Sequence, residues 1–200
     1  MPPDCDSDGD EAEETQPGKA KKSDSKRDRY IKHPETGKKR QEQHCRYNEF
    51  PTLQSFGCLL ESLRLAPTAR NQQPIRAWII KTPERLEDVK KVTQYHYDAP
   101  LMIAVGFVAE EAYVRQSDGL NFGIIDVSIA ATQLWLRVAD MGLGAVWLSD
   151  FDTEALKKEF PEFAPAEIVV LMQIGHPAED SHPIAWHSEK RPAAELLSTL

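Results

Sequence analysis

Apolar positions divide the chain into two unequal parts. Residues 1–47 contain only one member of the Leu, Ile, Val and Phe set, Ile31. A segment so poor in apolar side chains cannot bury enough surface to offset the entropy lost on ordering. The pattern therefore predicts a disordered, charged tail over residues 1–47 and a folded domain over residues 48–200.

Helical periodicity marks several parts of the domain. Apolar side chains recur at three- and four-residue intervals over residues 53–63 and 122–141. Residues with the chemistry of an N-cap begin two shorter helices, one at Thr82, which precedes a proline, and one at Asp152 or Thr153. We therefore expect four helices in this region, of which the one over 122–141 is about 30 Å long.

Four short apolar runs between these helices predict strands, over residues 77–81, 100–109, 145–149 and 168–174. The run 100–109 is apolar nearly throughout, which indicates a strand buried on both faces. Strands that alternate with helices favour a doubly wound parallel sheet on pattern alone. However, no glycine-rich phosphate-binding turn of the GxGxxG or GxxxxGK[ST] type follows any of them.

The helix over 122–141 is apolar on almost every side. Its polar residues that align in a stripe are Asp126, Gln133, Arg137 and Asp140. A helix of this kind is buried on most sides. In a domain of this size, we expect another subunit to supply part of that burial.

Charge and cysteine content narrow the function classes. The chain has 32 acidic and 24 basic residues, and the net charge is −1 over residues 1–50 and −7 over 51–200. An acidic domain argues against nucleic acid as a partner. Three cysteines without paired spacing argue against a disulfide scaffold or a metal site. No apolar run is long enough to span a membrane and no signal peptide is visible, so we expect a soluble, cytoplasmic protein.

The tail leaves a second interpretation open. Residues 19–40 hold ten bases and three acids, whereas the first 14 residues hold seven acids and no base. The two blocks neutralise each other in a solvated tail. The alternative is a weak contact between the basic block and a nucleic acid or an acidic partner.

Residues 66–74, which we call the amide loop, read APTARNQQP and lie between a predicted helix and a predicted strand. Asn and Gln side chains offer both hydrogen-bond donors and acceptors, so such a loop can bind a flat heterocycle with imide-like edges. The same residue types are also common in ordinary turns. Taken alone, this composition favours an ordinary turn.

The order of several motifs resembles the nitroreductase family. Residues 63–75 (LRLAPTARNQQPI) are similar to its FMN-binding signature ARxAPSxxNxQPW, with Thr for Ser at 68 and Ile for Trp at 75. Ala99-Pro100 before a buried strand, the stretch 141–152 (MGLGAVWLSDFD), residues 174–179 (IGHPAE) and Lys190-Arg191-Pro192 resemble further family motifs. Each motif is weak alone, but together they occur in the family's order.

The resemblance implies an α+β flavoprotein with a three-layer α/β/α arrangement. It replaces the parallel sheet with a mixed, largely antiparallel sheet that has helices on both faces. It also implies an obligate homodimer, with FMN bound at each subunit interface. The apolar helix over 122–141 is typical of a large dimer interface.

The resemblance assigns cofactor-binding roles to ten residues. Side chains of the amide loop would bind the flavin from the opposite subunit, the backbone from 147 to 150 would lie along the ring with an amide near Ser149 facing N5, and cations would hold the phosphate. Arg70 would contact either phosphate or solvent. The ten residues are Arg40, Thr68, Arg70, Asn71, Gln73, Trp147, Leu148, Ser149, Lys190 and Arg191.

The main departure from the family lies before the domain. Family members carry an RRSxR segment whose cations grip the phosphate, and here the corresponding region begins at Arg40 and has Glu42 at the Ser position. Arg46 is the alternative if a small gap is allowed. One or two phosphate ligands are therefore missing from the expected pattern.

The function that this resemblance implies is an oxidoreductase that uses FMN, takes hydride from NAD(P)H and passes it to a small electron-poor acceptor of the nitroaromatic or quinone type. In this class the cofactor carries the chemistry, so no catalytic side chain and no metal is expected. The alternatives are a flavin-binding or interaction module with little turnover, and specialised chemistry such as dehalogenation or flavin cleavage. The sequence does not choose between NADH and NADPH.

Overall fold

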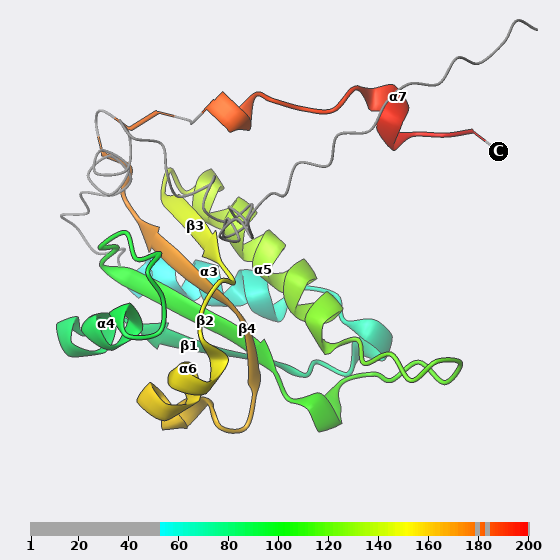
Figure 1. Cartoon of the computed structure of the whole chain (residues 1–200), viewed down its shortest axis with the longest axis horizontal. Helices are drawn as coiled ribbons and strands as arrows, with labels where there is room; N and C mark the ends of the chain where they lie inside the picture. Colours follow the sequence, from blue (N-terminus) through cyan, green and yellow to red (C-terminus); the bar gives the residue numbers. More distant parts are fainter. Residues whose placement is uncertain (1–52, 179–180, 183–184, 200) are drawn as a thin grey trace, which may run out of the picture. The chain divides into compact units, whose positions relative to one another are not determined.

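The computed structural model describes residues 53–178, 181–182 and 185–199 (Figure 1). The predicted tail, residues 1–47, and the candidate ligands Arg40 and Arg46 lie outside the described residues. All four predicted helices and all four predicted strands are confirmed, and a short C-terminal helix follows them. The helices and strands are α3 (Leu53–Arg64), β1 (Ile75–Ile80), α4 (Pro83–Lys90), β2 (Leu101–Phe107), α5 (Gly123–Asp140), β3 (Gly144–Leu148), α6 (Thr153–Glu159), β4 (Glu167–Gly175) and α7 (Ala193–Leu196).

The four strands form one antiparallel sheet in the order β1-β2-β4-β3. In the register, Ile79 faces Ile103 across β1 and β2, and Trp147 faces Met172 across β3 and β4. Each of the three pairings is antiparallel, and the described strands contain no parallel pair. The parallel sheet favoured by pattern alone is therefore wrong, because alternating strands and helices fix the order of elements and not the direction of each strand.

Side chains of β2 alternate between two hydrophobic clusters. Leu101, Ile103, Val105 and Phe107 pack with α3 and α5, whereas Met102 and Ala104 pack with residues of α4 and α6. The whole strand is buried, as its sequence predicted. Figure 1 shows α3 and α5 side by side along the sheet. This alternation follows from the two-residue period of a strand.

The helix α5 has one buried and one exposed apolar side. Val127, Ala130, Leu134 and Val138 are fully buried against the sheet. The other side leaves large apolar side chains 40–68% exposed: Ile124, Ile125, Ile129, Trp135 and Leu136. Burial of this second side by another subunit stays a prediction. Gly142 ends the helix with a φ of +71°, a left-handed conformation that glycine adopts without strain.

The starts of the helices differ in how they are capped. Asp152 accepts hydrogen bonds from the backbone N–H groups of Glu154 and Ala155 and so caps α6, as predicted. Thr82 occupies the N-cap position of α4, but its side chain makes no capping hydrogen bond. At the start of α5, Gly123 packs so closely on Phe107 that a Cβ atom would overlap the ring. No helix among the described residues has both the length and the apolar character that a membrane span needs.

Candidate functional site

Three residues of the amide loop have a left-handed backbone conformation. Arg70, Asn71 and Gln73 have φ angles of +54°, +57° and +53°. Left-handed backbone in residues other than glycine costs roughly 1 kcal/mol each. Since strained backbone concentrates at functional sites, the loop is a candidate binding element and differs from an ordinary turn.

Hydrogen bonds inside the loop fix its polar side chains relative to one another. The Thr68 hydroxyl Oγ1 accepts from the backbone N–H of Gln73 at 3.0 Å. The Gln73 side-chain Nε2 donates to Oδ1 of Asn71, also at 3.0 Å. The second bond uses one polar atom of each amide and leaves the donor Asn71 Nδ2 and the acceptor Gln73 Oε1 for other hydrogen bonds. The edge of an imide ring offers both an acceptor and a donor for such groups.

Two contacts tie Ala69 and Arg70 of the loop to the segment that follows β2. The backbone N–H of Ala69 donates to Oδ1 of Asp126 at 2.8 Å, and Asp126 lies in the first turn of α5 with only 1% of its surface exposed. The guanidinium of Arg70 lies 5.0 Å from the centre of the Tyr113 ring. The geometry thus directs Arg70 to an aromatic face, where a cation is attracted to the π electrons.

A cavity of about 330 Å³ lies beside the loop and is bordered by α3 and β1. Thr68 and Gln73 line it together with Ile75, the residue that stands where the resembled family has Trp. Two arginines also line it. Arg64 pairs with Glu61 at 2.6 Å, and Arg76 pairs with Glu111 at 2.7 Å. Hydrogen bonding to Arg64 lowers the pKa of the Glu61 carboxyl, and the same bond raises the pKa of Arg64.

The predicted residues at the end of β3 form a second polar group. The indole Nε1 of Trp147 donates to the Ser149 hydroxyl at 2.8 Å, and that hydroxyl donates to the carbonyl of Val169 at 2.8 Å. The Trp147 ring lies 6.2 Å from the ring of Trp135 on α5. Leu148 is 4% exposed and belongs to the core. Its side chain therefore cannot touch a ligand, and only its backbone is available for the role that the resemblance assigned.

We call Trp147, Leu148 and Ser149 the 147–149 group. The amide loop and this group do not meet within one chain. The loop leads into β1 and the second group ends β3, and these strands are the two outer strands of the sheet. Three strand spacings separate them, which is about 14 Å. The helix α5 lies between, since Asp126 contacts the loop and Trp135 contacts Trp147 about 13 Å further along the helix.

The last two predicted ligands, Lys190 and Arg191, lie in an exposed stretch, residues 185–199. Arg191 faces Glu195 at 3.9 Å, with 80% of its side chain exposed. A pair this exposed contributes little to stability, so the cation is free to bind an anion. Among the described residues, no three His, Cys, Asp or Glu side chains gather closely enough to hold a metal ion.

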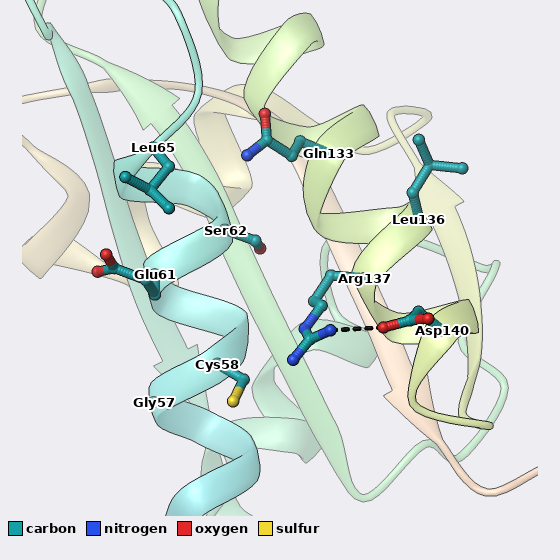
Figure 2. A pocket seen from close by; sticks show the side chains of 9 residues that line it. All are labelled: Gly57, Cys58, Glu61, Ser62, Leu65, Gln133, Leu136, Arg137 and Asp140. Carbon is teal, nitrogen blue, oxygen red and sulfur yellow. Dashed lines mark hydrogen bonds and ion pairs between the residues drawn. The ribbon is translucent and has the colours of Figure 1, made fainter.

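A larger cavity of about 910 Å³ opens between α3 and α5 (Figure 2). Figure 2 shows Cys58 of α3 facing Arg137 of α5, whose guanidinium pairs with Asp140. Hydrogen bonding to Cys58, and then the charge of Asp140, raise the pKa of Arg137. The remaining residues that line the cavity are Gly57, Glu61, Ser62, Leu65, Gln133 and Leu136.

Comparison with known proteins shows which proteins share this fold. Residues 94–176, from the segment before β2 to the start of the stretch after β4, match the sequence profile of the nitroreductase family. A nitroreductase family protein from Clostridium difficile 630 has a similar structure, with a TM-score of 0.70, 27% identity, and coverage of 77% of this chain and 91% of its own. Over residues 94–176 the chain therefore resembles the nitroreductase family.

Further proteins that this chain resembles carry related names. A protein from Archaeoglobus fulgidus, provisionally named NADH dehydrogenase/NAD(P)H nitroreductase, is 25% identical over 61% of this chain and 72% of its own length. A protein of the same name from Methanothermobacter thermautotrophicus is 28% identical over 61% of this chain and 65% of its own. A provisionally named nitroreductase from Desulfovibrio desulfuricans, solved in complex with FMN, has a TM-score of 0.63, 26% identity, and coverage of 84% and 98%.

The amide loop lies outside the residues that match the family profile. Its assignment to a nitroreductase site therefore depends on its motif and its geometry. The motif did not reveal two features of this site: the bond from Ala69 to Asp126 and the stacking of Arg70 on Tyr113. The sequence signal for the bond from Ala69 is Asp126, the single acid in the apolar first half of α5. The sequence pattern assigns Asp126 to the polar stripe of the helix, whereas in the structure it is buried.

Proposed function

We propose that this chain is an FMN-dependent oxidoreductase that takes hydride from NAD(P)H and passes it to an electron-poor acceptor of the nitroaromatic or quinone type. The observation that carries the proposal is the amide loop. The bond from Gln73 Nε2 to Asn71 Oδ1 leaves one amide donor and one amide acceptor in the strained loop, the two kinds of group that pair with the imide edge of a flavin. The FMN complex of the Desulfovibrio relative supports the choice of ligand.

The residues present fit the cofactor in three parts. In this proposal, Thr68, Asn71 and Gln73 hold the ring edge by neutral hydrogen bonds. The backbone from Trp147 to Asp150 lies along the ring, with its orientation set by the bonds from Trp147 to Ser149 and from Ser149 to Val169. The exposed cations Lys190 and Arg191 bind the phosphate, for which guanidinium is suited because it can form two parallel bonds.

A complete site requires two copies of the chain in this proposal. The amide loop and the 147–149 group lie on opposite edges of one sheet, so one ring cannot contact both in a single chain. The exposed apolar side of α5, with Ile124 and Leu136 at 57% and 68%, is suited to cover a second copy. The amide loop of one protomer would then face the 147–149 group of its partner.

When bound, FMN supplies hydride and electron transfer between a reduced nicotinamide and an acceptor. The protein's own residues hold the ring, orient it and exclude water from it. No side chain is required to give or take a proton from either substrate. Since the donor and the acceptor would occupy the same pocket in turn, this proposal predicts ping-pong kinetics.

The proposal is tested by replacing one amide of the loop. We expect Asn71→Ala to weaken FMN binding about tenfold, because it removes a neutral hydrogen bond to the ring and the partner of Gln73. The matched control is Gln72→Ala, since Gln72 is an exposed amide in the same loop with an ordinary helical backbone. The measurement is FMN titration by fluorescence quenching. Equal affinities of parent and both variants would return the loop to the status of an ordinary turn.

A second candidate function is a flavin-binding module with little turnover. The observation that favours it is Ile75, which lines the cavity beside the loop where the family usually has Trp. Such a module would bind FMN as the enzyme does but would not be reduced by NADH or NADPH. Stopped-flow reduction of the loaded protein separates the two, because only the enzyme loses its flavin absorption on mixing.

A further inference from the structure

Asp126 is the only buried acid among the described residues. Its exposed fraction is 1%, and it lies in the first turn of α5 among apolar neighbours of the core. A carboxylate in such surroundings is costly unless hydrogen bonds and favourable dipoles compensate. The N-terminal end of a helix supplies part of that compensation through its dipole. The amide loop supplies the rest through one specific bond.

That bond joins residues 57 positions apart in the chain. The Asp126 oxygen Oδ1 accepts the backbone N–H of Ala69 at 2.8 Å, whereas Oδ2 is buried and has no hydrogen-bond partner in the described structure. One carboxylate oxygen is therefore committed to the loop. Because Oδ2 has no partner, the carboxylate does not belong to a wider network of buried polar groups among the described residues.

The bonded amide stands immediately before the strained part of the loop. Ala69 precedes Arg70 and Asn71, both left-handed, and Gln73 follows with the same conformation. The bonds from Gln73 to Thr68 and to Asn71 are internal to the loop, so they stabilise its shape without fixing it to the domain. The bond to Asp126 fixes the loop to the core at the residue where the left-handed run begins.

We propose that Asp126 is a positioning residue for the flavin site: its buried carboxylate fixes the amide loop in its left-handed conformation and so directs Thr68, Asn71 and Gln73 at the ring. This inference rests on the proposed function for the identity of the ligand. The anchoring itself is a property of the chain without any ligand. The two parts are therefore tested separately.

The anchoring is tested by limited trypsin digestion of the full chain without FMN. Arg70 is an exposed trypsin site inside the loop, and cleavage there tracks the population of the open loop when opening is fast. A hydrogen bond to a charged group shifts such an equilibrium about ten- to a hundredfold. We expect Asp126→Ala to speed cleavage after Arg70 by at least about tenfold, with mass spectrometry identifying the fragments.

Two further variants make the result specific. Asp126→Asn keeps an oxygen acceptor for Ala69, so its cleavage rate after Arg70 should stay close to that of the parent. Asp152→Ala removes another aspartate from the first residues of a helix, at the start of α6, and should leave cleavage after Arg70 unchanged. An Asp126→Ala chain that is cut no faster than the parent would overturn the proposal, as would an Asp126→Asn chain that opens as readily as Asp126→Ala.

A further measurement uses the parent chain, so it does not depend on whether Asp126→Ala folds. The Ala69 amide should exchange with deuterium at least about tenfold more slowly than the backbone amide of Arg70, an exposed residue whose N–H donates no hydrogen bond in the described structure, and rapid exchange of Ala69 would refute the anchor. For the flavin part, FMN affinity should fall in Asp126→Ala and recover in Asp126→Asn. If the parent binds no FMN, the proposed function is wrong, and cleavage and exchange still decide whether Asp126 anchors the loop.

Discussion

At the scale of single residues, Gln173 shows how one buried amide can hold a chain segment in place. Its side chain is 1% exposed and lies in the middle of the sheet, on β4. Its Oε1 accepts the backbone N–H of Tyr97 at 3.0 Å, and its Nε2 donates to the carbonyl of Tyr95 at 2.8 Å. Both backbone groups precede β2, so Gln173 fixes the entry into the central strand.

Replacing this amide should destabilise the domain. In Gln173→Leu, two backbone groups lose their partner, and a buried group without a hydrogen bond costs about 1–3 kcal/mol. We expect the thermal midpoint to fall by roughly 5–15 °C, as for losses of this size in domains of similar length. The measurement is thermal denaturation followed by circular dichroism. Gln94→Leu, an exposed amide nearby, is the control, and equal midpoints for both variants would show that the two bonds contribute nothing.

A second prediction at this scale concerns the phosphate. Arg191→Ala should weaken FMN binding about ten- to a hundredfold, because it removes a charge-assisted contact. Since the side chain is 80% exposed, salt should weaken the contact in the parent too, and the difference should shrink at high ionic strength. Titrations at two salt concentrations measure this. Lys158→Ala, an exposed cation on α6, should bind as the parent does; the same loss in both would mean that only net charge matters.

Only part of the candidate site could be predicted from the sequence, for a physical reason. The residue types of the amide loop predicted hydrogen bonding to a heterocycle, because the donors and acceptors of an amide follow from residue type alone. The left-handed backbone of Arg70 and Asn71 was not predicted, because neither residue is glycine and the local sequence carries no other signal for this conformation. The buried position of Asp126 was likewise set by the packing of α5 and not by its local pattern.

At the scale of elements, the helix α5 carries the exposed apolar surface that a second copy of the chain would cover in our proposal. Its apolar positions predicted a helix buried on most sides, and the structure assigns one side to the sheet and leaves the other exposed. Leu134 is fully buried in the chain's own core, whereas Leu136 is 68% exposed. Leu134→Glu would therefore unfold a monomer as well, and it cannot test the dimer.

The exposed position gives the sharper prediction. If the α5 side is covered by a second copy, Leu136→Glu should convert the dimer into a folded monomer, because a charge in an apolar interface costs several kcal/mol without a partner. Ala164→Glu adds the same charge at another exposed site and should leave the dimer intact. Sedimentation equilibrium at micromolar concentration measures both. A parent chain that binds flavin as a monomer would contradict the prediction.

Element boundaries were predictable because apolar periodicity and caps are local. The strands 100–109 and 168–174 and the helix 122–141 all lie close to their predicted positions. Strand direction was not predictable from the pattern. The connections that contain α4 and α6 are each long enough to return the chain in either direction, so tertiary packing decides, and only the family resemblance indicated the antiparallel arrangement.

At the scale of the whole molecule, the tail and the domain are expected to be independent. Deleting residues 1–35 should leave the thermal midpoint and the oligomeric state nearly unchanged, because this segment has almost no apolar side chains to bury. Extending the deletion past Arg40 should lower FMN affinity, if that cation binds phosphate. Calorimetry and FMN titration of both truncations provide the test, and a midpoint lower by many degrees in the shorter deletion would show that the tail packs on the domain.

The central claim is that two copies of this chain hold a reducible FMN between the amide loop of one and the end of β3 of the other. The most direct measurement is the visible absorption spectrum of the purified protein, loaded with FMN and freed of excess, before and after anaerobic addition of NADPH or NADH. We predict a flavin spectrum at about one FMN per chain that bleaches when the nicotinamide is added. A colourless protein after loading, or a flavin that neither nicotinamide reduces, would contradict the account.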